Sequence, residues 1–149
     1  MKSLWNERAR LDLIRRMGRL TPATAPLWGR MNVSEMLAHV AEGMSMAYGE
    51  IPTKPRRGPF RRWPLKYLFV YLLPMPRGVR APREIVTRGR DAVAFESCLQ
   101  RLRFLIDEFP THDRRGTWAV HPILGSLSGS AWGALGWRHA DHHLRQFGC

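Results

Sequence analysis

The sequence predicts an all-α fold, a four-helix bundle in which a long connection joins the second and third long helices. Four segments place apolar residues three and four positions apart, the spacing that gives a helix one hydrophobic face. No segment alternates apolar and polar residues for long enough to predict a strand. Amphipathic helices bury these faces against one another, and 149 residues fit one domain spanning residues 1–149.

The first two helices have recognisable ends. Ser3 can cap a helix that extends to Arg19, because its hydroxyl can accept a bond from a free backbone N–H. The apolar face of this helix would comprise Leu4, Leu11, Ile14 and Leu20. Asn32 and Glu35 have the spacing of a capping box, so the second helix is expected from Asn32 to Gly49. One face of it would carry Met36, His39, Val40, Gly43 and Ala47.

The third and fourth helices are the longest. The third is expected from Arg88 to Phe109, where Pro110 ends it. Its apolar stripe would comprise Ala92, Phe95, Leu99, Leu102, Ile106 and Phe109. The fourth is expected from Gly129 to Phe147, with one of the two serines beside Gly129 as its cap.

The connection over residues 50–90 is a basic, irregular insertion rich in Pro and Arg. Between Lys54 and Arg90 it holds eleven Lys or Arg residues and a single acidic residue, Glu84. Residues 63–73 can form a short helix within it, placed as a lid over one end of the bundle. The face that packs on the bundle would comprise Leu65, Leu68, Phe69 and Leu72.

The chain has a net charge of +12, concentrated in this connection. Such a concentration of charge favours an anionic partner, either nucleic acid or a membrane surface, and aromatic residues among the arginines could stack on bases or lie on lipid. These aromatic residues are Phe60, Trp63, Tyr67 and Phe69. The alternative is a solvated loop whose aromatic residues pack the lid onto the bundle.

The sequence indicates a soluble, cytoplasmic protein. Its two cysteines, Cys98 and Cys149, do not suggest a disulfide framework. The first residues contain no apolar run typical of a secretory signal. The most apolar stretch, residues 65–73, is too short to span a bilayer.

Three histidines are the candidate metal ligands. His139 and His143 are four residues apart, so both imidazoles lie on one face of the fourth helix. His39, on the apolar face of the second helix, is the best third ligand, because bundle cores often hold metals between facing helices. Three neutral imidazoles leave a coordination position open, as catalytic sites do. Two alternatives remain: His142 could replace His143, and His39 could be a hydrogen-bonded core residue.

Two motifs carry a resemblance to a known superfamily. The first runs from Trp28-Gly29 to His39 and continues to Glu42. The second comprises His121-Pro122-Ile123-Leu124-Gly125 and then Trp132 through His139-Ala140-Asp141-His142-His143 to Gly148. With the looser Leu73–Gly78 segment, they resemble the DinB-like superfamily, and more closely a branch of uncharacterised bacterial proteins within it.

The resemblance implies an up-down-down-up four-helix bundle with one divalent metal ion on His39, His139 and His143. It places His142 at the rim of the site. Members are often homodimers. Some relatives are thiol-dependent S-transferases or isomerases that use a low-molecular-weight thiol, and many have no known activity.

These observations leave three classes of function open. The first is a metal-dependent enzyme, a hydrolase or a thiol S-transferase or isomerase, that uses Zn, Ni, Fe or Mn on a small molecule. Glu42 could act as a base or be a solvated acid, and Gln146 could orient a ligand or be an ordinary polar residue. Arg77, Arg80 and Arg145 are candidates by position for binding an anionic thiol. The second class is a non-catalytic metal-binding protein, and the third is a module that binds nucleic acid or a membrane surface through residues 54–90.

Overall fold

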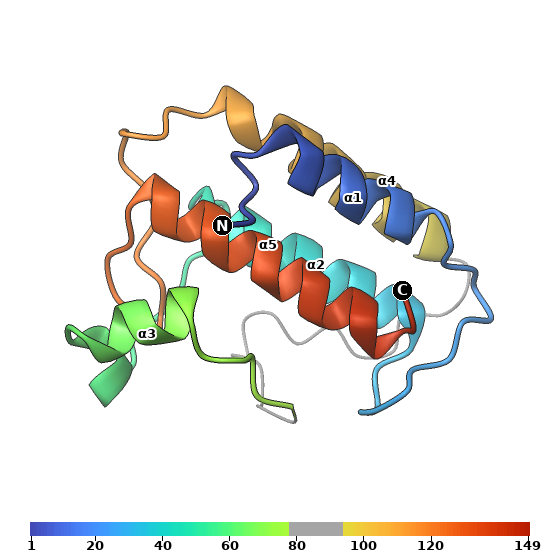
Figure 1. The fold of residues 1–149 in the computed structure, drawn as a ribbon, viewed down its shortest axis with the longest axis horizontal. Helices are drawn as coiled ribbons and strands as arrows, with labels where there is room; N and C mark the ends of the chain where they lie inside the picture. The colour runs from blue at the N-terminus through green and yellow to red at the C-terminus, as the bar shows by residue number, and fades with distance from the viewer. Residues whose placement is uncertain (78–93) are drawn as a thin grey trace.

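The computed structural model of the protein describes residues 1–77 and 94–149, and these residues are mostly helical, as the sequence predicts (Figure 1). The α-helices are α1 (Glu7–Met17), α2 (Val33–Ala47), α3 (Leu65–Tyr71), α4 (Phe95–Glu108) and α5 (Gly129–Gln146). Two 3₁₀ turns accompany them, η1 (Pro59–Arg61) and η4 (Phe109–Thr111). Within the described part of the chain, the β-pairing consists of an isolated bridge between His121 and Gly125.

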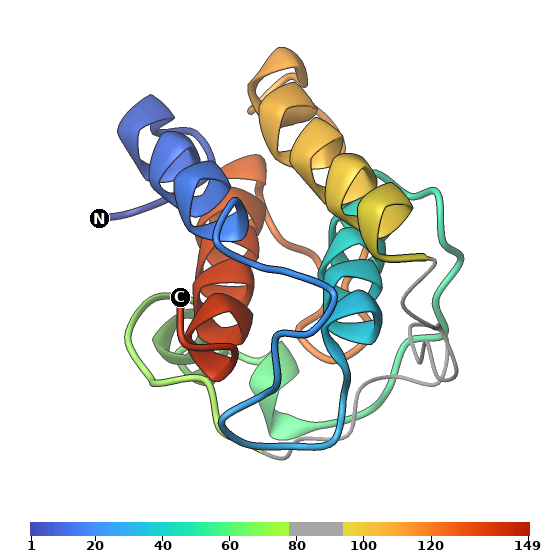
Figure 2. The ribbon, with the colours of Figure 1, turned by 90° about the vertical axis from the view of Figure 1, so that its right-hand side faces the viewer.

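The four longer helices contact one another in a closed ring. α2 packs on both α4 and α5, and α1 packs on both α5 and α4. The chain runs in one direction in α1 and α5 and in the opposite direction in α2 and α4 (Figure 1). Viewed from the side, α1 and α5 lie together and α2 and α4 lie together, with the loop before α2 crossing from one pair to the other (Figure 2). The helix that connects α2 to α4, α3, contacts α5.

The helix starts follow the capping chemistry of the sequence at two of three places. Asn32 and Glu35 form the predicted capping box, with backbone-to-side-chain distances of 2.8 and 3.0 Å. Ser128 caps α5 by accepting a bond from the Ala131 N–H. The prediction for the first helix was wrong, because Asn6 caps α1 and accepts a bond from the Ala9 N–H at 2.9 Å.

The described part of the third long helix matches the predicted apolar stripe. α4 starts at Phe95, whereas the expected start at Arg88 and the stripe residue Ala92 lie outside the described residues. The rest of the predicted stripe is buried or partly buried in the core. The stripe prediction is therefore confirmed from Phe95 to Phe109.

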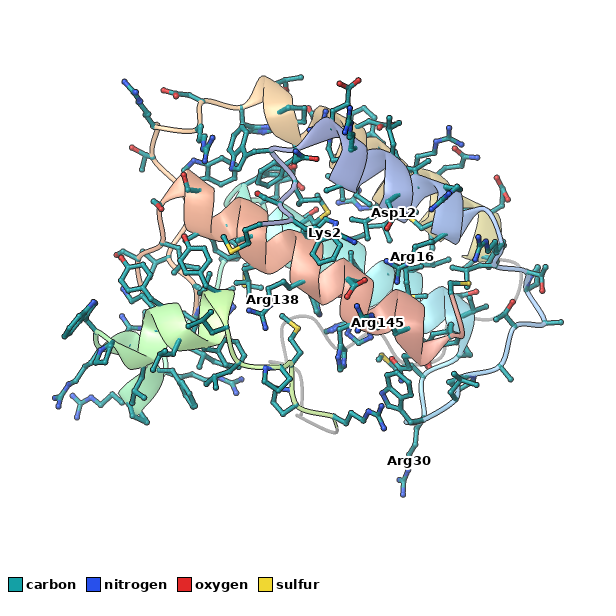
Figure 3. The ribbon with its side chains drawn as sticks, viewed as in Figure 1. Lys2, Asp12, Arg16, Arg30, Arg138 and Arg145 are labelled. Atoms are coloured by element: carbon teal, nitrogen blue, oxygen red, sulfur yellow. The ribbon has the colours of Figure 1, made fainter. Side chains whose placement is uncertain are left out.

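A buried ion pair between Arg16 and Asp141 joins α1 to α5. Figure 3 labels Arg16 on α1 and Arg145 on α5. Arg16 donates to Asp141 Oδ1 at 2.7 Å, and the two residues are each 9% exposed. Arg145 approaches the other carboxylate oxygen of Asp141 at 3.0 Å. Asp141 therefore compensates two arginines on one side of α5.

The lid helix packs with only part of the predicted face, since Leu68 and Phe69 are half-buried and Phe69 packs against the core. Val70 is fully buried, whereas Leu72 is 72% exposed and Leu65 is also exposed. The physical reason is that Arg138 of α5 donates to the backbone oxygens of Val70 and Leu73, which fixes the rotation of α3. Among the described residues, no helix is both long enough and apolar enough to cross a membrane.

Candidate metal centre

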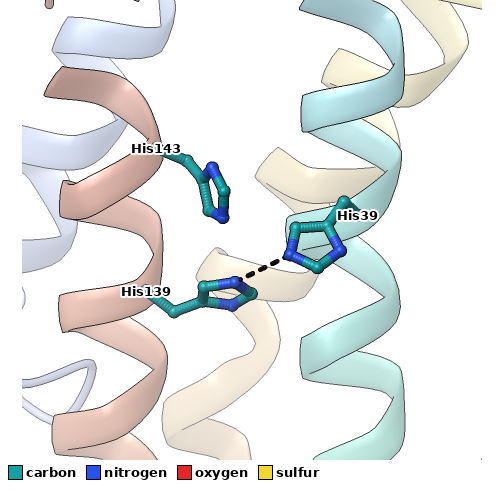
Figure 4. A group of neighbouring side chains, drawn as sticks. All are labelled: His39, His139 and His143. Carbon is teal, nitrogen blue, oxygen red and sulfur yellow. Dashed lines mark hydrogen bonds between the residues drawn. The ribbon is translucent and has the colours of Figure 1, made fainter. Parts of the chain in front are cut away.

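The three predicted ligands meet between α2 and α5 (Figure 4). His39 extends from α2, and His139 and His143 extend from consecutive turns of α5. The Nε2 atoms of His39 and His139 are 3.0 Å apart. One nitrogen from each of the three rings lies within 4.8 Å of the other two.

This spacing is close to what one metal ion requires. With metal–nitrogen distances of about 2.0–2.1 Å, two ligands of a tetrahedral ion are separated by about 3.3 Å. The His39–His139 distance is slightly shorter than that value, and the three ring centroids are 4.8–4.9 Å apart. Small rotations of the rings would bring all three nitrogens to one ion.

A glycine makes room for the ring of His139. A Cβ atom at Gly43 would lie 3.2 Å from both Cε1 and Nδ1 of His139, closer than ordinary van der Waals contact. Gly43 is one turn after His39 on α2. Its missing side chain therefore allows the two histidine-bearing helices to approach at this level.

Gln146 fixes the orientation of His143. Its Nε2 donates to the backbone oxygen of Trp28 at 2.6 Å, and its Oε1 lies 2.8 Å from Nδ1 of His143. Because the Trp28 carbonyl can only accept, the amide nitrogen must face it and Oε1 must face the histidine. The proton of His143 therefore lies on Nδ1, and the lone pair on Nε2 is available to a metal.

The loop before α2 is shaped around this amide. Gly29 adopts φ of 86°, and a Cβ atom there would lie 2.5 Å from Nε2 of Gln146. Side chains are strained in this backbone region, so both the conformation and the space favour glycine. The sequence leaves two roles open for Gln146, and its only signal for Gly29 is the Trp28-Gly29 pair of the first motif.

The imidazoles of α5 are held in the neutral form. Burial lowers the pKa of His139 well below its ordinary value, and the nearby His143 and His39 lower it further. Burial also lowers the pKa of His143, to about 3, with a smaller contribution from His39. Neutral imidazole is the form that binds a metal, so no proton has to be displaced from these ligands near pH 7.

The other candidate residues lie around the cluster. His142 does not belong to the ligand group, although its ring is 5.1 Å from that of His143. Burial and then the Arg77 charge lower the pKa of His142. Glu42 lies on α2, one turn after His39. Arg80 lies outside the described residues.

A basic pocket of about 330 Å³ lies beside His142. Arg77 stacks on the Trp28 ring at 4.1 Å, and Arg145 lies on α5 at the same pocket. The lining residues are Trp28, Pro74, Met75, Arg77, Trp137, Arg138, Asp141, His142 and Arg145. Three arginines and one carboxylate give this pocket a net positive charge.

Two further histidines have structural surroundings. His112 stacks on Tyr48 with ring centroids 4.2 Å apart. His121 accepts bonds at Nδ1 from the backbone N–H groups of Ile123 and Leu124, and burial lowers its pKa to about 4. These contacts indicate a structural role for both residues.

Comparisons with known proteins place the chain in a family without assigning an activity. Neither the curated proteins nor the solved structures gave a significant match. One family model, described as protein of unknown function (DUF1569), matches residues 8–148 and thus nearly the whole chain. The chain therefore belongs to the DUF1569 family of proteins of unknown function.

Proposed function

We propose that the protein binds one divalent transition-metal ion on His39, His139 and His143 and acts as a metal-dependent enzyme on a small anionic molecule. The observation that carries the proposal is the convergence of three imidazoles from two helices, within 4.8 Å of one another. Two further features support it. Burial keeps His139 and His143 neutral, and Gln146 directs the Nε2 lone pair of His143 toward the cluster.

The donor set favours a catalytic over a closed structural site. Three protein ligands leave at least one position of a zinc-like ion open, and imidazole suits Zn, Ni and Fe, with Mn a weaker match. When bound, such an ion supplies Lewis-acid chemistry that lowers the pKa of a coordinated water or thiol. Gln146 keeps the proton of His143 on Nδ1, which leaves the Nε2 lone pair for the metal. Glu42 is the candidate to accept a proton nearby.

The basic pocket supports an anionic substrate or co-substrate. The guanidinium groups of Arg77 and Arg145 can bind a carboxylate or phosphate. His142 lines this pocket and its ring lies 5.1 Å from that of His143, whereas none of the three proposed ligands lines the pocket. We infer two reaction classes, hydrolysis and thiol S-transfer or isomerisation with an anionic low-molecular-weight thiol.

We further propose that the four long helices form the up-down-down-up bundle of the DinB-like superfamily. The directions of α1, α2, α4 and α5 and their ring of contacts support this assignment. The positions of the three histidines on the second and last long helices support it as well. The homodimer, the cytoplasmic location and the single-domain organisation remain predictions.

Metal analysis of protein purified without a histidine tag tests the centre. After incubation with Zn, Ni, Fe or Mn and removal of free ion, we expect one equivalent of metal per chain. His143→Ala should lower metal affinity by at least about 100-fold, because two imidazoles hold an ion far less tightly than three. His142→Ala is the matched control and should keep its metal. Absence of bound metal, or loss in His142→Ala but not in His143→Ala, would overturn the assignment.

An activity screen tests the enzyme part of the proposal. The metal-loaded protein would be assayed for conjugation of low-molecular-weight thiols to a panel of electrophiles, and for hydrolysis of small carboxylate and phosphate esters. We expect turnover that disappears in His143→Ala and persists in Gln100→Ala, whose amide bonds Glu96 on the surface of α4. A protein that binds one metal ion but turns over nothing in either panel would instead be a non-catalytic metal-binding protein.

A further inference from the structure

Exposed apolar side chains gather in one stretch of the chain, residues 59–73, here called the α3 segment. Of the large hydrophobic side chains that are exposed in the described residues, six lie within it, namely Phe60, Trp63, Leu65, Tyr67, Leu72 and Leu73. Trp63 is 78% exposed and Leu72 is 72% exposed. Soluble surfaces carry scattered apolar residues, but a gathering of this kind indicates a binding surface.

The outward face of α3 is its apolar face. Leu65 and Leu72 are two helical turns apart, and both lie on the side opposite to the buried Val70. An amphipathic helix that packs on a core normally turns such leucines inward. In α3 the leucine stripe is directed away from the helices on which it packs.

Hydrogen bonds hold the α3 segment in this orientation. Arg138 of α5 donates to the backbone oxygens of Val70 and Leu73. Lys66 donates to the backbone oxygen of Ser126 at 2.9 Å, and Arg61 donates to that of Pro122 at 3.2 Å. Four bonds to backbone carbonyls therefore fix the rotation, so the outward leucines are a feature of the packed structure.

Positive charge surrounds the apolar face. Residues 51–77 contain seven Lys or Arg residues and no acidic residue. Lys54, Arg57 and Arg62 are exposed. Exposed apolar side chains bordered by cations alone match the composition of the membrane interface, where acyl chains lie below anionic headgroups.

We propose that the α3 segment docks on the surface of a bilayer that contains anionic lipid. Trp63, Leu65 and Leu72 enter the boundary between headgroups and acyl chains, and the neighbouring Lys and Arg residues contact lipid phosphates. The proposal rests on the exposed side chains of this segment and does not depend on a metal.

Two observations favour lipid over nucleic acid. Exposed leucines have no ring on which a base could stack, whereas their burial in an apolar layer is favourable in free energy. Four of the five aromatic rings of the segment are already paired, because Tyr67 stacks on Tyr71 with 4° between the ring planes, and Phe60 packs against Phe69. The exception is Trp63, which is 78% exposed. Bases would need such ring faces to be available for stacking.

Vesicle binding by the full chain tests the proposal. Sedimentation with phosphatidylcholine vesicles containing about 30% phosphatidylglycerol should capture the protein, pure phosphatidylcholine should capture much less, and raising salt from about 0.05 to 0.3 M should weaken binding. Trp63→Gln combined with Leu72→Gln should reduce vesicle affinity at least about tenfold. Leu11→Gln combined with Phe104→Gln is the matched control, since it removes two exposed apolar residues elsewhere and should change nothing.

A charge variant and an oligonucleotide distinguish lipid binding from nucleic-acid binding. Arg57→Gln combined with Arg62→Gln should reduce binding to anionic vesicles by about tenfold and leave circular dichroism unchanged. An oligonucleotide of the same charge density should bind more weakly than the vesicles. The proposal is overturned by absence of vesicle capture, by an equal loss in the Leu11/Phe104 control, or by oligonucleotide binding that is tighter than vesicle binding.

Discussion

The histidine cluster and the α3 segment depart from ordinary packing in opposite directions. Between α2 and α5, three titratable rings are turned into an apolar interior. In α3, leucines are turned out toward solvent while Val70 fills the inward position. Both regions break the usual rule of apolar residues inside and polar residues outside, and such departures concentrate where a protein binds something.

Hydrogen bonds from side chains of α5 to backbone carbonyl groups hold both regions in place. The Gln146 amide donates to the backbone oxygen of Trp28, and the Arg138 guanidinium donates to backbone oxygens at the end of α3. In each case a polar side chain of α5 holds a loop or helix through its carbonyl groups. Hydrogen bonds from α5 therefore hold both regions, and because different residues donate them, mutations can separate one region from the other.

The largest expected effect is on stability through the metal. Free metal at about 1,000 times its Kd should stabilise the fold by about 4 kcal/mol, which raises the Tm of a chain of this size by about 10 °C. His39→Ala should lose this shift, as measured by thermal scans with and without chelator. The Trp63/Leu72 double variant should keep it, and a reduced shift in that variant would contradict the separation of the two regions.

The next largest effect concerns Gln146. Gln146→Ala should weaken metal binding by about 10- to 100-fold, because His143 loses the partner that fixes its tautomer. Competition against a chromogenic chelator measures the change. Gln100→Ala on α4 is the matched control, since its amide bonds Glu96 on the surface. An unchanged metal affinity in Gln146→Ala would show that His143 is oriented by other contacts.

Acid should destabilise the metal-free protein through His121. Burial lowers the pKa of this residue from 6.5 to about 4, so below pH 6.5 the unfolded chain binds a proton that the folded protein does not. Between pH 7 and pH 5 the folded state should therefore lose about 2 kcal/mol from this residue alone. Urea unfolding of His121→Asn, which keeps an acceptor but does not titrate, should show a correspondingly weaker loss. An identical pH dependence in both proteins would contradict this origin.

The smallest effects distinguish the two faces of α3. Val70→Ala should cost about 1–2 kcal/mol, because it removes methyl groups from a fully buried side chain. Leu72→Ala should change the free energy of unfolding by less than about 0.5 kcal/mol, because the side chain is mostly exposed. Chemical denaturation measures both. A larger cost for Leu72 than for Val70 would mean that α3 packs with the face first predicted.

The helical character and the three histidines could be predicted because both follow local rules. Helical spacing places His139 and His143 on one face, and the Asn32–Glu35 capping box sets the start of the helix that carries His39. These signals depend on residues close in sequence. The structure brings the three rings together, whereas metal binding itself remains a proposal.

The errors fall where distant residues decide the outcome. The rotation of α3 depends on Arg138, which lies 68 residues from Val70, so the apolar pattern of the short helix predicted a face that is only partly buried. Asn6 caps α1 in place of the predicted Ser3, because the Ser3 hydroxyl accepts a bond from the backbone N–H of Trp5. The need for glycine at position 29 follows from the close approach of the Gln146 side chain, which lies more than 100 residues later in the sequence. The spacing of residues within one segment does not predict contacts between segments that are far apart in the sequence.

The separation of the histidines along the chain also sets an order of assembly. His39 precedes His139 by 100 residues, so during synthesis α2 emerges long before α5 exists. Before α5 has been synthesised, the nascent chain presents only one of the three imidazoles, and the arrangement of all three does not yet exist. A metal ion bound as we propose can therefore load only after the last helix has docked, because the three imidazoles do not meet before that step.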